Sequence, residues 1–498
     1  MESIEHLIGG KKTSEAGGRL GPVFNPATGI QIADVALASA DEISKAIEIA
    51  DSAFSEWSSR TPINRARVMY RYKQLLEKHA EELAELVSRE HGKTLPDALG
   101  SVQRGIEVVE FACGIPQLLK GEYSSSVGSD VDSYNTRKPL GVCVGITPFN
   151  FPAMVPLWMF PIALACGNTF ILKPSEKDPS CPFRMVELAH EAGVPPGALN
   201  VVNGDKEAVD ALLADSRVKA VSFVGSSPIA EYVYHLGTAN NKRVQALGGA
   251  KNHMIVMPDA DSNRTVDALV GSAFGSAGER CMAISVAVCV GDETANRIRD
   301  DLITATSKLK IGPYTDPEAD YGPVNTKHQL DKIIGYVEKG EQEGAKLVAD
   351  GRGVSLQGYE GGYFLGPCIF DHVTTDMTIY QEEIFGPVLS IVRASEYGEA
   401  LRMANEHPLG NGAAIFTNNG GVARHFVDHA QVGMVGVNVP IPVPVASHSF
   451  GGWKGSLFGD HAMHGPEGVR FYTKLKTATI TWPDGENAGP EFSIPVLS

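Results

Sequence analysis

The chain has 498 residues, of which 43% are hydrophobic and 20% are charged, and it carries a formal net charge of −16 at pH 7. This length exceeds what one hydrophobic core holds, so the chain is expected to form two or three domains. The acidic balance, without a cluster of lysines or arginines, argues against a nucleic acid as a partner. No apolar run has the length of a membrane span, and residues 1–6 lack the layout of a signal or transit peptide.

The cysteines are scattered along the chain and include no CxxC pair. They lie at positions 113, 143, 166, 181, 281, 289 and 368. Such spacing suits neither a zinc site nor a disulfide framework, and thiols of this kind are typical of a reducing compartment. We therefore expect a cytoplasmic protein that holds no metal and is not bound to a membrane.

The first 120 residues have the pattern of a strand-and-turn region followed by helices. Glycine, proline and asparagine mark turns within residues 1–40. Helices are predicted over 40–57, 62–90 and 96–119, the second opened by a proline in its first turn. Arg104 lies off the apolar stripe of the third helix.

From residue 141 onward, short apolar runs alternate with helical patterns. The predicted strands are 141–146, 169–172, 199–202 and 220–224, and the predicted helices are 152–165, 180–191, 207–213 and 229–236. Strands and helices that alternate at this length predict a parallel sheet with right-handed crossovers.

A second series of the same kind begins near residue 248. Its predicted elements are a strand at 253–257, a helix at 262–274, a strand at 284–290, a helix at 294–309, a loop at 311–326, a helix ending near 343 and two strand–helix units reaching about 439. Residues 472–482 then alternate threonines with apolar side chains, which is typical of an edge strand that another subunit covers. The pattern predicts an α/β protein with two parallel-sheet domains and a tail that pairs subunits.

Residues 275–285 form a glycine-rich turn between a predicted helix and a predicted strand, and they contain Cys281 directly after Arg280. Glycines at such a corner let backbone N–H groups approach a bound group. A neighbouring cation favours the thiolate, which is the nucleophilic form of cysteine. The alternative is a buried structural cysteine that follows a helix.

Three further motifs follow predicted strands. Asn150 opens a helix and can donate to an oxyanion, or it can simply cap that helix. Lys173 and Glu176 end the next strand, where they can hold ribose hydroxyls or form a solvated pair. Gly225 and Ser226 precede a helix start that can attract phosphate, although a plain strand–helix connection has the same pattern.

In this order, and together with Glu382–Val388 and Phe450–Lys454, these motifs resemble the aldehyde dehydrogenase superfamily over nearly the whole chain. The resemblance implies that Cys281 is the nucleophile and that Asn150, with the Cys281 backbone N–H, forms the oxyanion hole. It also implies NAD as the cofactor. The implied NAD contacts are Thr147, Phe149, Lys173, Glu176, Gly225, Ser226, Glu383 and Phe385.

The resemblance further implies two Rossmann-like parallel-sheet domains and a small β arm. On this basis residues 1–121 and 142–247 are expected to form the NAD-binding domain, and residues 248–449 the catalytic domain. Residues 122–141 and 466–498 are expected to bridge subunits in a homodimer or homotetramer.

The chain departs from the superfamily at Ala246. Most hydrolytic members carry a glutamate in the matching segment, where it serves as the base for water that attacks the thioester. Here alanine occupies that position, and Gln245 beside it is not a base. Without a positioned base water is a poor nucleophile, whereas a thiol needs less help. We therefore expect a thiol to remove the acyl group.

The missing glutamate, the Gly249–His253 and Gly278–Ala283 segments and the run 148–204 resemble one branch of the superfamily, the CoA-acylating methylmalonate-semialdehyde dehydrogenases. The resemblance implies oxidation of methylmalonate or malonate semialdehyde to propionyl-CoA or acetyl-CoA, with loss of CO2 or bicarbonate. Breakdown of valine or of inositol would supply such substrates. A hydrolytic semialdehyde dehydrogenase and a catalytically silent binding protein are the alternatives.

Such substrates carry a carboxylate, for which arginine is the natural partner. Arg280 is one candidate, and the resemblance adds Arg104 as the second. Each has a simpler alternative role. Arg104 could only pair with Glu107 one turn further along its helix, and Arg280 could only lower the pKa of Cys281.

Overall fold

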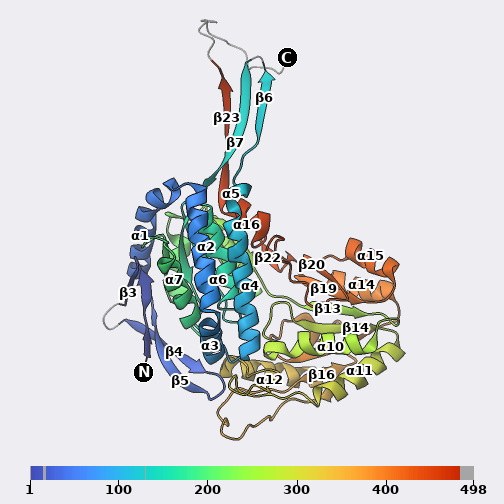
Figure 1. Cartoon of the computed structure of the whole chain (residues 1–498). Helices are drawn as coiled ribbons and strands as arrows, with labels where there is room; N and C mark the ends of the chain where they lie inside the picture. Colours follow the sequence, from blue (N-terminus) through green and yellow to red (C-terminus); the bar gives the residue numbers. More distant parts are fainter. Residues whose placement is uncertain (1, 15–17, 129, 483–498) are drawn as a thin grey trace.

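A computed structural model describes residues 2–14, 18–128 and 130–482 of the chain. Two large sheets, each covered by helices, lie at the centre of the molecule, and a narrow β arm extends from it (Figure 1). The α/β class predicted from the sequence is therefore confirmed.

The first large sheet has the strand order β22-β12-β11-β8-β9-β10-β2-β3. Its strands are β2 (His6–Ile8), β3 (Lys11–Thr13), β8 (Val142–Ile146), β9 (Thr169–Lys173), β10 (Leu199–Val201), β11 (Val218–Val224), β12 (Arg243–Leu247) and β22 (Leu457–Phe458). The strands from β12 to β10 run parallel to one another, and β2, β3 and β22 pair antiparallel at the edges.

Helices cover both faces of this sheet because β8 and its neighbours are apolar on both. Within β8, Cys143 packs into the cluster formed with α2, α4, α6 and α7, whereas Val142 and Val144 pack into the cluster formed with α1, α8 and α9. The helices are α1 (Ala40–Ser59), α2 (Pro62–Lys78), α3 (Ala80–His91), α4 (Leu95–Cys113), α5 (Ile115–Leu118), α6 (Met154–Ala165), α7 (Ser180–Glu191), α8 (Lys206–Ala214) and α9 (Ser227–Ala239).

Two of the predicted helices are each divided. The predicted helix 62–90 is α2 and α3, separated at His79, whose backbone leaves the helical region at φ −104° and ψ 15°. The predicted helix 96–119 is α4 and the short α5, which Gly114 separates. The apolar stripe continues across both breaks, so the periodicity of the sequence carries no sign of them.

The second large sheet has the order β15-β16-β17-β14-β13-β19-β20, in which every neighbouring pair is parallel except β15 with β16. Its strands are β13 (Asn252–Val256), β14 (Ile284–Val290), β15 (Lys346–Ala349), β16 (Cys368–Asp371), β17 (Val388–Ala394), β19 (Gly412–Phe416) and β20 (Met434–Val437). Its helices are α10 (Ser262–Phe274), the 3-10 turn η1 (Gly275–Gly278), α11 (Asp292–Thr306), α12 (Lys327–Gln342), α13 (Thr378–Gln381), α14 (Tyr397–Glu406) and α15 (Gly420–His429). Both α10 and β14 have the predicted bounds, whereas the short β15, β16 and α13 are absent from the prediction.

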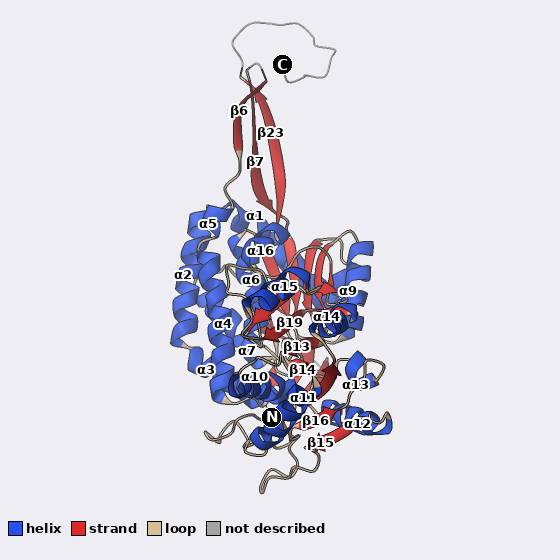
Figure 2. Cartoon of the chain, turned by 90° about the vertical axis from the view of Figure 1, so that its right-hand side faces the viewer, coloured by secondary structure: helices blue, strands red, loops and turns tan. Residues whose placement is uncertain are grey.

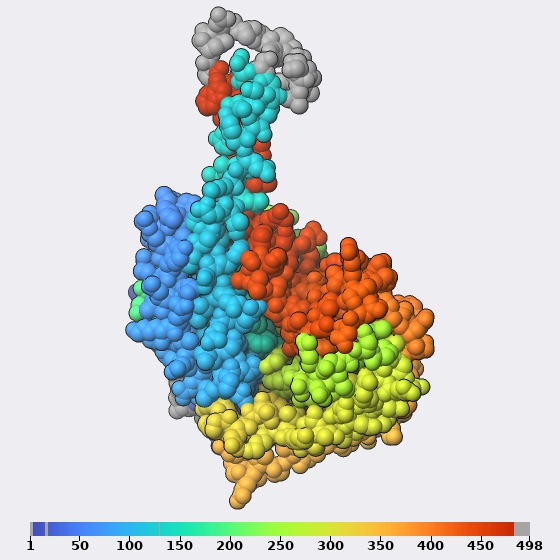
Figure 3. Space-filling view, turned by 45° about the vertical axis from the view of Figure 1, so that its right-hand side comes forward, coloured from blue at the N-terminus to red at the C-terminus, as the bar shows by residue number. Residues whose placement is uncertain are grey.

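The arm is a three-stranded antiparallel sheet of β6 (Tyr123–Gly128), β7 (Val131–Pro139) and β23 (Thr473–Thr481), with β7 in the middle. It stands clear of the body in the cartoon and in the space-filling view (Figures 2 and 3). The predicted tail strand is therefore confirmed. Pairing of subunits through the arm stays a prediction, and residues 483–498 of the expected bridging segment lie outside the described residues.

Smaller elements complete the fold. They are β1 (Glu2–Ile4), β4 (Arg19–Asn25), β5 (Ile30–Leu37), β18 (Leu409–Gly410), β21 (Trp453–Lys454) and α16 (Gly465–Phe471). In the part of the chain that the structure describes, no helix is both long enough and apolar enough to cross a bilayer. β12 of the first sheet ends at Leu247 and β13 of the second sheet begins at Asn252, and the domain boundary near residue 248 stays a prediction.

Candidate active site

A cleft of about 810 Å³ lies at the carboxyl ends of β8, β9 and β11, which is where parallel sheets bind ligands. All ten residues predicted for catalysis and for cofactor binding line it. They are Thr147, Phe149, Asn150, Lys173, Glu176, Gly225, Ser226, Cys281, Glu383 and Phe385. The loop after α13, which carries Glu383 and Phe385, comes from the second sheet, so the cleft lies between the two halves of the molecule.

The turn before Cys281 has a backbone that only a few residue types adopt easily. Ser276 and Ala277 have φ values of 55° and 52°, and Gly278 has φ 72°. A Cβ atom on Gly278 would lie 2.2 Å from the carbonyl oxygen of Gly386, so glycine is required there. Cys281 follows this turn and is half-buried, whereas the other six cysteines are buried. Cys281 therefore differs from the other cysteines in its exposure, and its role as the nucleophile stays a prediction.

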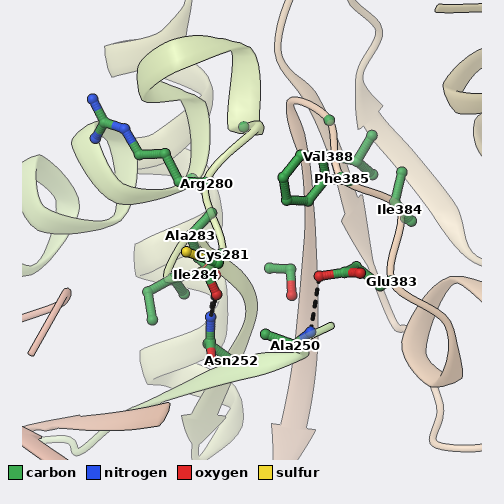
Figure 4. A pocket seen from close by; sticks show the side chains of 14 residues that line it. Ala250, Asn252, Arg280, Cys281, Ala283, Ile284, Glu383, Ile384, Phe385 and Val388 are labelled. Carbon is green, nitrogen blue, oxygen red and sulfur yellow. Dashed lines mark hydrogen bonds between the residues drawn. The ribbon is translucent and has the colours of Figure 1, made fainter. Parts of the chain in front are cut away.

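Burial raises the pKa of the Cys281 thiol to about 11, and the carboxylate of Glu383 adds to the shift. Backbone N–H groups and the charge of Lys93 lower the same pKa by less. Arg280 is not among the causes, because its guanidinium is directed away from the sulfur (Figure 4). The alternative role of Arg280, that it only lowers this pKa, is therefore not supported: its guanidinium donates to Asp97 instead.

Lys93 is a residue that the sequence analysis missed. It is 1% exposed, its Nζ donates to the backbone oxygen of Asn150 at 2.8 Å, and it lies 4.2 Å from the centre of the Phe151 ring. No local sequence pattern indicates that a single lysine between two helices lies beside the nucleophile. It is the cation that acts on the thiol of Cys281.

Asn150 faces the loop that carries Cys281, which we call the nucleophile loop. Its Nδ2 donates to the carbonyl oxygen of Glu279 at 3.0 Å, two residues before the cysteine. The helix that follows is capped at Ala153 and receives no side-chain hydrogen bond, so the alternative role of Asn150 as a helix cap is excluded. The amide is buried and is held within the cleft by its own bond to the loop.

Glu279 itself is another residue that the sequence did not single out. It is fully buried, its Oε2 accepts from the backbone N–H of Asn325 at 3.1 Å, and it lies 4.0 Å from Nε2 of His91. Burial raises the pKa of Glu279 to about 8. The ring of His91 stacks on Phe149 at a centroid distance of 5.8 Å, so this buried pair lies behind the wall of the cleft.

The other end of the cleft has the groups that a nucleotide needs. Nζ of Lys173 lies 3.4 Å from Oε2 of Glu176 at the end of β9. Ser226 is the N-cap residue of α9, and its side chain makes no capping bond. Oγ1 of Thr147 is buried and has no hydrogen-bond partner among the described residues. These donors and the positive end of α9 fit an anionic dinucleotide.

Glu383 and Phe385 form the opposite wall. One carboxylate oxygen of Glu383 accepts from the backbone N–H of Ala250 at 2.8 Å, and a Cβ atom on Gly249 would lie 2.4 Å from the other. Phe385 has φ 58° and meets the ring of Phe149 edge to face at 5.9 Å. Both rings line the cleft together with Cys281.

The two arginines lie outside the residues that line this cleft. Nη2 of Arg280 donates to Asp97 at 2.8 Å, and Nη2 of Arg104 donates to the carbonyl oxygen of Pro444 at 2.7 Å. Arg104 also forms the ion pair with Glu107 that was considered as its simpler role. Asp97 and Arg104 are seven residues apart on α4 and so share one face of this helix. Arg104 is therefore part of α4, and Arg280 contacts the same helix through Asp97.

Ala246 lies on β12, fully buried and in register with Phe223 on β11. Gln245 points to the other face, where its Oε1 accepts from the hydroxyl of Ser222 and its Nε2 donates to the carbonyl of Ala462 at 3.1 Å. Its polar atoms are therefore occupied, and the position that carries a base in hydrolytic relatives is filled by a methyl group.

The sequence profile of the aldehyde dehydrogenase family matches residues 13–478. A malonate-semialdehyde dehydrogenase of Pseudomonas aeruginosa is 56% identical over the full length of both chains, and one of Geobacillus thermodenitrificans is 49% identical over 97% of this chain and 99% of its own.

Two crystal structures are also similar. One is a protein of Sinorhizobium meliloti in complex with NAD, and the other comes from Oceanimonas doudoroffii; both are described as methylmalonate-semialdehyde dehydrogenases. Each has a TM-score of 0.96 and 56% identity over 97% of this chain and 99% of its own. The chain therefore belongs to the aldehyde dehydrogenase family, as the order of its motifs implies.

Proposed function

We propose that the protein oxidises methylmalonate semialdehyde or malonate semialdehyde with NAD, loses CO2 from the product and transfers the acyl group to CoA. The observation that carries this proposal is the combination of the half-buried Cys281 with an alanine at position 246. The first residue forms a thioester and the second leaves no base to hydrolyse it. The two groups of relatives act on these semialdehydes according to their names.

The reaction begins when the thiolate of Cys281 attacks the aldehyde carbon. The negative oxygen that forms is stabilised by Nδ2 of Asn150 and the backbone N–H of Cys281. Bound NAD accepts the hydride that leaves this carbon. Because the free thiol has a raised pKa, the thiolate depends on the N–H groups and on Lys93 that oppose the shift.

The cofactor is proposed to lie with its ribose hydroxyls at Lys173 and Glu176 and its phosphates at the start of α9, beside Gly225 and Ser226. Glu383 is proposed to hold the second ribose. Thr147 offers a buried hydroxyl without another partner among the residues described, which suits a bound polar group. Phe149 and Phe385 exclude water from the end of the cleft near the sulfur.

The second half of the reaction starts from a thioester with a carboxylate on the neighbouring carbon. Its C–C bond breaks, CO2 leaves, and the electron pair forms an enolate whose oxygen stays in the same oxyanion hole. After this carbon takes a proton, the CoA thiolate attacks the carbonyl and Cys281 leaves as a thiolate. The products are acyl-CoA, CO2 and NADH.

The CoA requirement is tested by mixing enzyme, NAD and semialdehyde with and without CoA and measuring NADH. With CoA we expect sustained turnover and acyl-CoA as the product. Without CoA we expect a burst of one NADH per active site followed by a rate at least about 100-fold lower, because no base activates water. Sustained turnover to a free acid without CoA would favour hydrolysis over acyl transfer.

The carboxylate of the substrate is proposed to bind Arg280 and Arg104. A guanidinium has five donors, so Arg280 keeps several free of its bond to Asp97. Arg280 lies on the side of Cys281 away from Glu383 and Phe385 (Figure 4), and it contacts α4, the helix that carries Arg104, through Asp97.

Replacing Arg280 or Arg104 by leucine is expected to raise the KM for the semialdehyde about tenfold or more, because a hydrogen bond between charged groups is lost. The KM for propanal, which has no carboxylate, should change less than about twofold. Steady-state kinetics with both aldehydes measure this difference. An equal effect on the two substrates would refute the clamp.

The arm is proposed to pair with a second copy of the chain in a homodimer or homotetramer, and the protein is proposed to be cytoplasmic. The exposed Leu475 and Tyr123 on the arm are apolar side chains that a second subunit would cover.

A further inference from the structure

Residues Ala250–His253, which we call the bracket, contact two loops. The cofactor loop follows α13 and carries Glu383, and the nucleophile loop carries Cys281. Ala250 and Lys251 end the connection from β12 of the first sheet, and Asn252 and His253 begin β13 of the second. Figure 4 shows Ala250 and Asn252 between the cofactor loop, which carries Glu383, and the nucleophile loop, which carries Cys281. In the sequence this segment is only part of a motif, and the proposed reaction gives it no role.

The first half of the bracket holds the cofactor loop. The backbone N–H of Ala250 donates to the carboxylate of Glu383. Nζ of Lys251 donates to the carbonyl oxygens of Ile379 at 2.7 Å and Glu382 at 2.8 Å. Lys251 is 2% exposed, so these carbonyls replace the water that its ammonium group loses. The lysine thus fixes the peptide that precedes Glu383.

His253 adds a second anchor for the same loop. Its Nδ1 donates to the carbonyl oxygen of Lys251 at 2.7 Å, and its Nε2 lies 3.0 Å from the hydroxyl of Tyr380 in α13. The backbone of the bracket and the helix that leads into the cofactor loop are therefore tied through one buried ring.

The second half of the bracket holds the nucleophile loop. Nδ2 of Asn252 donates to the carbonyl oxygens of Cys281 and Ala283, both at 3.0 Å, and its Oδ1 accepts from the backbone N–H of Gly412 at 3.0 Å. Asn411 donates to the same Cys281 oxygen at 3.1 Å. The peptide of the nucleophile is thus fixed by two amide side chains.

The two loops also touch each other directly. Gly278 leaves no space for a Cβ atom beside Gly386. Between the loops remains a cavity of about 20 Å³ lined by Asn252, Cys281 and Glu383, which is room for about one water molecule. A small shift of either loop therefore changes the distance between the nucleophile and the carboxylate that is proposed to hold the cofactor.

We infer that Lys251 and Asn252 are positioning residues with separate tasks: Lys251 places Glu383 for the cofactor, and Asn252 places Cys281 and its backbone N–H for the attack. The inference rests on the proposed roles of Glu383 and Cys281. Because the two neighbours hold different loops, substitutions of each should change different properties.

The experiment uses Lys251→Met and Asn252→Asp in the full-length enzyme. Lys251→Met removes both donated bonds at similar volume, and we expect the Kd of NAD to rise about tenfold. Asn252→Asp keeps the oxygen that accepts from the backbone N–H of Gly412. It replaces the amide donor by a carboxylate oxygen, which repels the carbonyl oxygen of Cys281. Here we expect the rate of alkylation of Cys281 by iodoacetamide and kcat to fall about tenfold. In each variant the other property should stay within about twofold.

Matched controls come from a buried lysine and a buried asparagine beside strands of the first sheet, away from the bracket. Nζ of Lys242 donates to the carbonyl oxygens of Asp215 and Val218. Oδ1 of Asn168 accepts from the backbone N–H of Leu140, and its Nδ2 donates to the carbonyl oxygen of Tyr472. Lys242→Met and Asn168→Asp are expected to lower Tm and to leave NAD affinity and alkylation unchanged. If Lys251→Met or Asn252→Asp does not fold, Lys251→Leu and Asn252→Ala replace them, since neither leucine nor alanine has a side-chain donor.

The inference is overturned if both properties fall together in both variants, or if the controls lose them equally. NAD binding and alkylation require neither CoA nor semialdehyde. A failure of the proposed acyl transfer therefore leaves this result unchanged, whereas wild-type enzyme that binds no NAD would contradict the proposed function itself. Alkylation reports on Cys281 because the other cysteines are buried.

Discussion

Replacing Cys281 by alanine is expected to abolish NADH formation, both the first turnover and the sustained rate, with a loss of at least about 10⁴-fold. The hemithioacetal cannot form without the sulfur, so hydride transfer has no starting point. The measurement is NADH production after rapid mixing of enzyme, NAD and semialdehyde. NAD affinity should persist, because the cofactor half of the cleft keeps all its side chains.

The control for this variant is Cys289→Ala. Cys289 lies on β14, eight residues further along the same part of the chain, and is fully buried. Its loss is expected to lower Tm and to leave kcat nearly unchanged. A burst of NADH from Cys281→Ala would contradict covalent catalysis by this residue.

Replacing Asn150 by alanine is expected to lower kcat by about 10²–10³-fold, which is the usual effect of removing one oxyanion donor. The amide also donates to the carbonyl of Glu279, so the same variant could displace the nucleophile loop. Alkylation of Cys281 by iodoacetamide separates the two effects, because that reaction forms no oxyanion. We expect alkylation to change less than about threefold while kcat falls.

Asn168→Ala provides the comparison for Asn150→Ala, since Asn168 is a fully buried asparagine with its own backbone partners outside the cleft. It should cost stability without a comparable loss of kcat. A fall in kcat of less than about threefold in Asn150→Ala would remove this amide from the oxyanion hole.

Local patterns predict those parts of the fold in which one periodicity covers a whole element. The bounds of α10 and β14 follow from the change between helical and strand periods on either side of a glycine-rich turn. The break at His79 and the strand β15 are missing from the prediction for opposite reasons. At His79 the apolar stripe continues through the break, and β15 is a four-residue strand without a fully buried side chain.

Residues at the ends of parallel strands could be predicted as site residues because the sheet brings these ends together. Lys93, Glu279 and Asn252 could not, because their partners depend on how distant segments pack. The carbonyl of Asn150, which Lys93 contacts, lies 57 residues further along the chain. Such contacts follow from the tertiary structure, and no spacing in the sequence encodes them.

The packing of Ala246 against Phe223 has a consequence for how this protein could change its reaction. A glutamate introduced at position 246 would place a carboxylate among fully buried apolar side chains, at a cost of several kcal/mol. A single Ala246→Glu substitution would therefore lower the stability of the fold while it supplied a base. Acyl transfer and hydrolysis are thus separated at position 246 by the stability of the sheet as well as by the chemistry of the side chain.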